Sequence, residues 1–180
     1  MGILRVNMKK IITVFIATII LFSCDSNSNI SSFKVKKPNQ IKNEISETIF
    51  IKINTTEDVS EDRKYELELF CKSLYFDENK KLSWNAAKNW KLKNPIPMSI
   101  AYFEIENSND NIAISIFPGE AGGIEENVNR WREQLTLPPQ NFNQFKKDIM
   151  NSPFFGDYYI FHETNTNNSI IAAIIQIKNL

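Results

Sequence analysis

The segment Phe117–Pro139 constrains the fold of this chain more than any other stretch. Gly122-Gly123 opens it and Pro138-Pro139 closes it. Between them, apolar residues recur at steps of four, three and four: Ile124, Val128, Trp131 and Leu135. Glycine lets a backbone reverse, this spacing gives a helix one buried face, and proline cannot continue a helix. The sequence therefore predicts a strand that turns into a helix near Gly123–Leu135.

The charges of this segment fit the same helix. Glu120, Glu125 and Glu126 lie near its positive N-terminus, and Arg130 and Arg132 follow later, as the helix dipole favours. Glu126 and Arg130 are also spaced as an i,i+4 ion pair. A phosphate-binding loop is a poor interpretation of the glycines, because no Lys-Ser or Lys-Thr follows them and the glutamates would repel an anion.

A second, polar stripe runs beside the apolar one. Asn127, Arg130 and Gln134 stand at positions i, i+3 and i+7 of the predicted helix. Such side chains could fasten neighbouring loops through hydrogen bonds, or they could hold the carboxylate or phosphate of a ligand. Both interpretations remain open on the sequence alone.

The rest of the body predicts short strands and one further helix. Thr48–Ile53 is strand-like, and Met98–Glu106 with Asn111–Phe117 form a hairpin pattern around the turn residues NSND. Two more hairpins are expected, one around DENK (Asp77 to Lys80) and one joining DYYIFHE to SIIAAIIQI. Tyr65–Phe76 is predicted as a strand because its residues alternate, although Leu67, Phe70, Cys71 and Leu74 also fit a helical stripe.

Asn141–Met150 predicts the second helix, because Phe142, Phe145 and Ile149 fall on one side and Pro153 ends it. This order of elements indicates an α+β fold. We expect a single globular domain over residues 43–180, with helices packed on a mainly antiparallel sheet.

The N-terminus has the pattern of an export signal. Met8-Lys9-Lys10 precedes the apolar run Ile11–Phe22, which is too short to span a membrane. Ser23-Cys24 then resembles the bacterial lipobox, which implies cleavage after residue 23 and lipidation of Cys24. We therefore expect a signal peptide at 1–23, and a lipidated cysteine with a Ser/Asn/Lys-rich tether at 24–42.

These features place the domain in the bacterial cell envelope, periplasmic or extracellular, with the membrane as its anchor partner. Three of the 21 basic residues lie in the leader, so the mature chain is mildly acidic against 21 acidic residues. Nucleic acid is therefore not expected as a partner. With Cys24 lipidated, Cys71 has no internal disulfide partner. It is either a reactive thiol or, the interpretation that we favour, a small buried apolar residue.

No catalytic, metal or cofactor site is predicted. His162 is the chain's single histidine, which excludes a multi-histidine zinc site, and no nucleophile elbow accompanies it. We expect an outer-face or hairpin histidine. The acidic run Glu57–Asp62 lacks the glycine and spacing of an EF-hand loop and is expected to be a solvated loop. Carboxylates that meet only in three dimensions remain possible in principle, so a hydrolase-type enzyme is the alternative to a non-catalytic domain.

The stretch from Ser83 to Pro139 resembles a family of uncharacterised bacterial lipoproteins. Its pattern combines PGxAGG with NVNRWRxQxGLPP, and Gly119, Asn127–Trp131, Gln134 and Pro138-Pro139 match it. Thr136 and Asn89 depart from it, each standing where the family has glycine. The family also tends to end in a further aromatic strand, so the last strand is expected to be lost or the sequence truncated, leaving a sheet edge exposed.

The family resembles in turn the Mog1/PsbP fold, an α/β/α sandwich, and brings no known activity. We therefore expect a non-catalytic accessory or binding domain, with a protein partner conceivable and no tight small-molecule ligand.

Overall fold

The computed structural model describes residues 44–56 and 61–178, and residues 39–180 form one compact unit. The predicted leader, Cys24 and the tether up to residue 42 lie outside the described residues, as do positions 57–60 of the acidic run. In chain order the elements are β1 (Ile45–Thr55), α2 (Glu61–Lys72), β2 (Tyr75–Phe76), β3 (Leu82–Ser83), β4 (Trp90–Lys93), β5 (Ala101–Ile105), β6 (Asn111–Pro118), α3 (Ile124–Gln134), a 3-10 helix η1 (Phe142–Gln144), β7 (Lys147–Ser152), β8 (Gly156–Thr164) and β9 (Ser169–Lys178).

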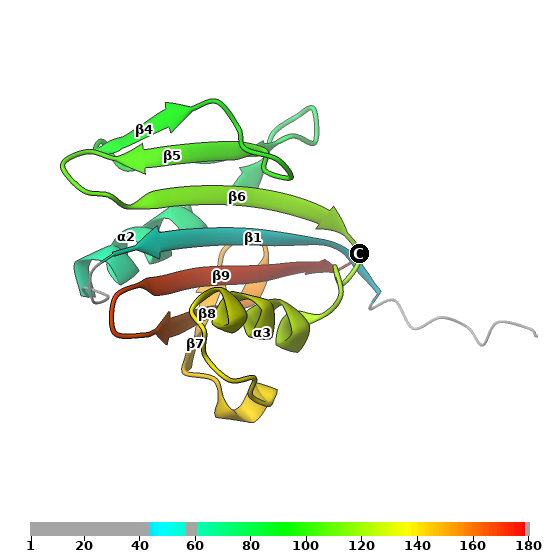
Figure 1. Cartoon of the computed structure of the whole chain (residues 1–180). Helices are drawn as coiled ribbons and strands as arrows, with labels where there is room; N and C mark the ends of the chain where they lie inside the picture. The colour runs from blue at the N-terminus through cyan, green and yellow to red at the C-terminus, as the bar shows by residue number, and fades with distance from the viewer. Residues whose placement is uncertain (1–43, 57–60, 179–180) are drawn as a thin grey trace, which may run out of the picture. The chain divides into compact units, whose positions relative to one another are not determined.

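The architecture is a seven-stranded sheet in the order β4-β5-β6-β1-β9-β8-β7, with a small β2-β3 hairpin beside it. Every neighbouring pair in the large sheet is antiparallel (Figure 1). β1 lies in the centre, paired with β6 on one side and β9 on the other. The prediction of an α+β fold built on an antiparallel sheet is confirmed.

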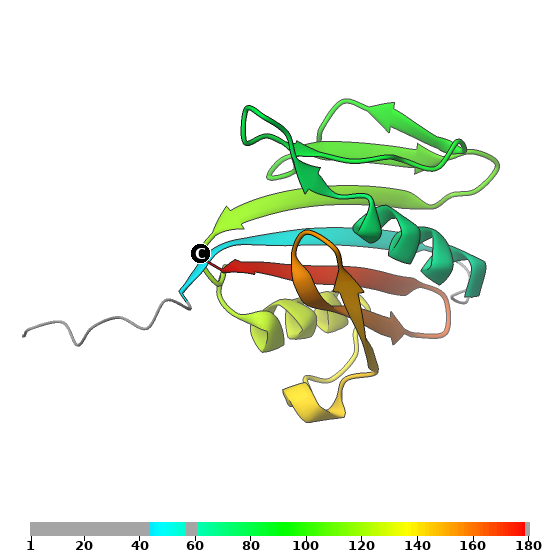
Figure 2. The ribbon, with the colours of Figure 1, turned by 180° about the vertical axis from the view of Figure 1, so that it is seen from behind.

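Apolar side chains of β1 are buried on both faces of the sheet. Ile49, Ile51 and Ile53 belong to one hydrophobic cluster, and Phe50 belongs to another. Because successive side chains of a strand point to opposite faces, the two clusters lie on opposite sides of the sheet. α2 covers the first face and α3 the second, so the sheet lies between two helices (Figures 1 and 2).

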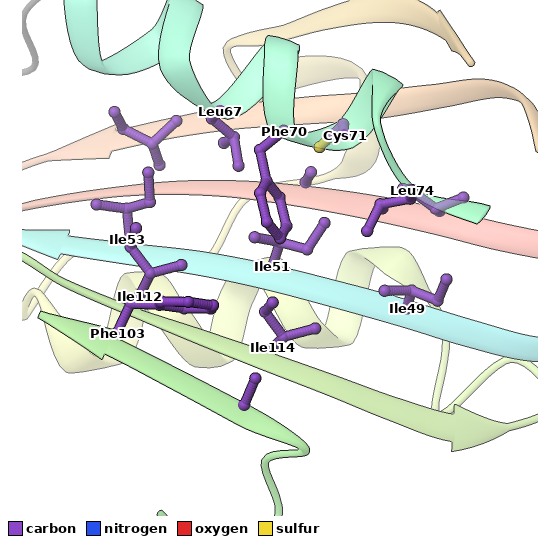
Figure 3. Packing of buried hydrophobic residues seen from close by; sticks show 14 of the residues in the cluster. Ile49, Ile51, Ile53, Leu67, Phe70, Cys71, Leu74, Phe103, Ile112 and Ile114 are labelled. Carbon is purple, nitrogen blue, oxygen red and sulfur yellow. The ribbon is translucent and has the colours of Figure 1, made fainter. Parts of the chain in front are cut away.

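The first cluster forms under α2, where Leu67, Phe70, Cys71 and Leu74 lie against the isoleucines of the sheet (Figure 3). The strand predicted for Tyr65–Phe76 is therefore wrong, except at Tyr75–Phe76. In a strand, Tyr65 and Leu69 would have shared the face of Leu67. Both are instead exposed on the far side of α2, because the 3–4 spacing matches the sheet surface and the alternation does not.

The second cluster forms under α3, which confirms the helix predicted near Gly123–Leu135. Val128, Trp131 and Leu135 are buried, and the Trp131 ring meets Phe50 edge-on with centroids 6.0 Å apart. Ile124, at the first turn, is only half-buried. The apolar stripe thus identified the buried face, and only its first member lies at the margin.

The second predicted helix, Asn141–Met150, is wrong. Only η1 is helical there, and the chain then pairs as β7 with β8. Phe145 is buried in the second cluster, whereas Ile149 is 68 % exposed on the edge strand. Pairing with β8 satisfies the backbone of Lys147–Ser152, and this tertiary pairing overrides the helical spacing of three apolar residues.

The predicted hairpins are all present. β5 and β6 flank the NSND turn, β2 and β3 flank the DENK turn, and β8 and β9 form the C-terminal hairpin. The first of these begins later than expected, at Ala101. Residues 94–100 form a loop instead, in which Met98 has a φ of +65°.

Candidate functional site

The turn between β6 and α3 is fixed by hydrogen bonds from side chains on two elements. Asn127 Nδ2 donates to the carbonyls of Ala121 (2.9 Å) and Gly123 (2.6 Å). Thr48 Oγ1 donates to the Gly119 carbonyl at 2.7 Å. The backbone takes positive φ at Gly119, Ala121, Gly122 and Gly123, so these bonds hold a conformation that few residues adopt. Asn127 therefore has the fastening role.

Arg130, the second member of the polar stripe, has no such role. Its side chain is exposed and makes no ion pair or hydrogen bond with any described residue. The pairing with Glu126 suggested by its spacing is not formed. Nη2 lies beside the glycine turn, 3.8 Å from the position a Cβ would take at Gly122. The guanidinium is thus available to a ligand.

Gln134, the third member, contacts a cation from the centre of the sheet. Lys52 Nζ on β1 donates to Gln134 Oε1 at 2.9 Å. Burial lowers the pKa of the Lys52 ammonium, because a charge is less stable where water is excluded. No carboxylate among the described residues pairs with Lys52. The fold thus holds a partly desolvated ammonium without a counter-charge.

These side chains line an open groove of about 550 Å³, within the size range of small-molecule sites. In Figure 1 α3 lies in front of β8 and β9, while β4, β5 and β6 have no helix in front of them. The groove is lined by α3, by β1 and β6 of this face, and by the 96–99 loop. Its apolar lining consists of Phe50, Ile96, Pro97, Met98, Ala113, Phe117, Pro118, Ala121 and Trp131. Its polar lining consists of Lys52, Ser99, Ser115, Asn127, Arg130 and Gln134.

Two properties of this lining matter for binding. It holds two cations, and no Asp or Glu is among its described residues. Met98 on its rim is 80 % exposed in a left-handed backbone conformation, which a large side chain rarely adopts. An exposed apolar side chain held in a disfavoured conformation often marks a binding surface.

A second cavity, of about 460 Å³, lies where β8 extends past the start of β7. It is lined by Glu61, Lys64, Arg132, Leu137, Lys146, His162, Glu163 and Thr164. β7 pairs with β8 only up to Phe161, so His162, Glu163 and Thr164 have no partner strand on that side. This cavity brings together the histidine and the carboxylates that an enzyme would need.

His162 lies in the β8-β9 hairpin, as one of the two expectations had it, but it is buried on the α2 face and not on an outer face. Its Nε2 lies 3.2 Å from Asp148 Oδ2, and Lys64 Nζ lies 2.7 Å from the same oxygen. Burial lowers the pKa of His162, aided by Lys64 and opposed by Asp148. The pKa of Asp148 is lowered too, first by the hydrogen bond from Lys64. At neutral pH the imidazole is therefore uncharged, and the Asp148 carboxylate is already paired with the Lys64 ammonium.

Glu163 points to the opposite face, where it forms a buried ion pair with Arg132 of α3. Burial raises the pKa of its carboxyl, and Arg132 opposes this shift. Arg132 Nε also donates to the Pro138 carbonyl at 2.8 Å, and Glu163 Oε1 has no hydrogen-bond partner among the described residues. Sequence analysis missed this pair. The only signal was the position of Arg132 next to Trp131, at the margin of the buried stripe.

Because His162 and Glu163 are consecutive in a strand, their side chains lie on opposite faces of the sheet. Both nevertheless line the cavity at the sheet edge, where the Glu163 carboxylate is already paired with Arg132 and is not free to act as an acid or base beside His162. Cys71 is buried under α2, and burial raises the pKa of its thiol, which fits the inert interpretation. The described residues contain no group of three or more His, Cys, Asp or Glu side chains that could hold a metal.

Comparisons with known proteins give no family for the chain: no family model, curated protein or solved structure matches it. Across residues 44–56 and 61–178, no helix has both the length and the apolar character needed to cross a membrane.

Proposed function

We propose that this chain is a non-catalytic, lipid-anchored binding domain of a bacterial cell envelope, and that it holds a small anionic ligand in the groove beside α3. The observation that carries the proposal is the pair of cations in that groove. Arg130 has no partner among the described residues, Lys52 is partly desolvated, and no acidic residue of the described lining offsets them. Uncompensated charges in a concave, largely apolar site favour an anion. This departs from the sequence-based expectation of no tight ligand.

The anchoring part rests on the N-terminal pattern. The basic start, the apolar run Ile11–Phe22 and Ser23-Cys24 occur in the order of a lipoprotein signal. Several acyl chains would hold the domain stably at a bilayer, because each buried methylene contributes about 0.8 kcal/mol. Mass spectrometry of the mature N-terminus tests this: a diacylglyceryl-modified Cys24 is expected, and an unmodified peptide spanning Cys24 would refute it.

The finer fold assignment is also a proposal. An antiparallel sheet between two helices supports the relationship to the Mog1/PsbP fold that the sequence resemblance implies. An experimental structure of the domain provides the test. The same strand order and the same helix placement as in that fold would support the relationship, and a different strand order would refute it.

The competing function is a hydrolase-type enzyme centred on His162. The contact with Asp148 favours it, because a neutral histidine oriented by a carboxylate can act as a general base. Two features oppose it. Asp148 is shared with Lys64, and the second buried carboxylate, Glu163, lies on the other face with Arg132. The enzyme therefore remains the second candidate.

The proposed function is tested by screening anionic metabolites against residues 25–180, which contain the whole compact unit, with melting temperature as the readout. A ligand that binds the native state raises Tm, and the rise grows with the logarithm of its concentration above Kd. We expect a stabilising hit that is lost in Arg130→Ala. Lys81→Ala is the matched control, since it removes one exposed positive charge from the β2-β3 turn on the other face. A hit retained in Arg130→Ala and lost in His162→Gln would favour the enzyme instead.

A further inference from the structure

One cation of the groove lies at the end where α3 finishes. Lys52 on β1 has its Nζ 2.9 Å from Oε1 of Gln134, the last residue of α3. Phe50 and Thr48 precede Lys52 at steps of two residues, so all three side chains point to the face that α3 covers. On this face, β1 therefore leads from Lys52 through Phe50 to Thr48.

The other cation lies at the end where α3 begins. Thr48 Oγ1 donates to the Gly119 carbonyl at 2.7 Å, which holds the turn before α3 beside Thr48. The Arg130 side chain leans toward the N-terminus of its helix, as helical side chains do. Its Nη2 lies 3.8 Å from the position that a Cβ would take at Gly122. The guanidinium is therefore beside this turn and not beside Lys52.

Strand and helix geometry give similar lengths between the two ends. Lys52 and Thr48 are four residues apart in β1, which is about 13 Å at 3.3 Å per residue. Ile124 and Gln134 are ten residues apart in α3, which is about 15 Å at 1.5 Å per residue. Because both basic side chains are long and reach into the groove, their charged groups are on the order of 10 Å apart.

The groove between the cations is apolar and largely aromatic. Phe50 is paired with Ser115 of β6, and its ring centroid lies 6.0 Å from those of Phe117 and Trp131. All four side chains line the groove, and its described lining includes no Asp or Glu. A ligand that lies between the two cations therefore meets rings and a small hydroxyl, and it meets charges only at its ends.

We infer that the ligand of this groove is an elongated dianion, with a carboxylate or phosphate group at each end of an apolar body and roughly 8–11 Å between them. This rests on the proposed function and adds the chemical class of the ligand. One anionic group lies at Lys52 and the amide of Gln134, and the other lies at Arg130 beside the glycine turn.

The argument for two anionic groups is the charge of the groove. Neither Lys52 nor Arg130 has a carboxylate partner among the described residues. A ligand with one anionic group would cover the groove and leave one of these cations unpaired, which costs free energy where water is excluded. A guanidinium and an ammonium both pair with carboxylate and phosphate, so the kind of anionic group is decided by experiment.

Residues 25–180 are titrated by calorimetry with dicarboxylates of three lengths. At roughly 1.2 Å per bond of an extended chain, the carboxyl carbons are about 4 Å apart in succinate, 8 Å in suberate and 11 Å in sebacate. The diphosphate ester of octanediol tests phosphate. Octanoate and decanoate carry one anionic group at the same lengths, and octanediol carries none.

At least one of the three long dianions is expected to bind. Succinate is expected to bind about tenfold or more weakly, because it cannot reach both cations, and octanoate, decanoate and octanediol are expected to be weaker by a similar factor. The long dianion that binds most tightly identifies the anionic group and its spacing.

Variants at each end locate the two anionic groups. Arg130→Ala and Lys52→Met each remove one cation, and each should weaken the long dianion by about tenfold or more, the range of a hydrogen bond between charged groups. In either variant the preference for the dianion over the monoanion of equal length should be lost, which a general change in the fold would not cause. Lys81→Ala should bind as the unmodified chain does.

Several outcomes would overturn the inference. Equal binding of the monoanion of the same length would show that one anionic group suffices, and tightest binding of succinate would show that both cations hold a single group. Equal binding of octanediol would show that charge is irrelevant, and unchanged binding in both variants would place the dianion outside the groove. If no long dianion binds but another anion stabilises the domain through Arg130, the ligand class is wrong and the proposed function stands. If no anion binds at all, both are wrong.

Discussion

The two cavities of this domain contain similar charged side chains but differ in what those side chains already contact. In the cavity beside His162, Arg132 is buried with Glu163, and Lys64 is paired with Asp148. In the groove beside α3, within the part of the chain that the structure describes, Arg130 has no partner and Lys52 contacts only an amide oxygen. Arg130 and Arg132 are two positions apart on one helix. The comparison shows that a charged side chain is available to a ligand only where it is not already paired with another side chain of the fold.

The largest expected loss of folding stability comes from a substitution in the cavity beside His162. Arg132→Ala leaves the Glu163 carboxylate buried without its partner, and breaking a buried ion pair in this way destabilises a protein by about 3–5 kcal/mol. Urea denaturation should show this loss. Arg130→Ala on the same helix is the matched control and should change the free energy of unfolding by less than about 0.5 kcal/mol. Equal losses in both variants would remove the distinction between the cavities.

A smaller effect separates the members of the polar stripe from one another. Asn127→Ala removes the donor to the Ala121 and Gly123 carbonyls and should lower the free energy of unfolding by about 1–2 kcal/mol. Gln134→Ala should have little effect on stability, because its one contact is at the surface. If Asn127→Ala unfolds at the same urea concentration as the unmodified chain, Asn127 does not fasten the turn.

Lys52→Met tests whether the groove holds a charge that folding disfavours. Because burial destabilises the ammonium, replacing it with an apolar side chain should leave stability unchanged or raise it by about 0.5–1 kcal/mol. Binding of the anionic ligand should weaken in the same variant. A marked loss of stability would mean that Lys52 is structural, and the contrast with Arg132 would fail.

The smallest expected effect is a pH dependence from His162, the single histidine of the sequence. Its folded pKa is lowered below the unfolded value near 6.5, with Lys64, Lys146 and Asp148 facing it. The stability it contributes is therefore present above pH 6.5 and is lost as the pH falls through the folded pKa. His162→Gln should flatten this part of the stability curve. An unchanged curve in the variant would show that another group titrates.

Much of this fold can be predicted from the sequence because many strands alternate and the α3 stripe is regular. The two errors have one physical cause. Tyr65–Phe76 contains a pattern that fits both a strand and a helix, Asn141–Met150 has a helical spacing of only three apolar residues, and in both stretches tertiary contacts decide the structure. The sheet surface selects the helical face of Leu67 and Phe70, and β8 pairs with Lys147–Ser152.

The candidate site was predicted in part. The helical spacing placed Asn127, Arg130 and Gln134 on one face, but it could not assign each a different role. Lys52 stands 82 positions from Gln134, and no local pattern connects them. Only the pairing of β1 with β6 and the packing of α3 bring these side chains together.

The most direct test of the account is an NMR titration of residues 25–180 with an anion that raises Tm in the metabolite screen. Trp131 lines the groove, whereas Trp84 and Trp90 pack in the cluster under α2, so the three indole signals report on opposite faces. The account predicts a saturating shift of the Trp131 indole signal, abolished by Arg130→Ala, with the His162 ring signals unchanged. Saturating shifts at His162 with a fixed Trp131 signal would contradict it and place the binding site in the other cavity.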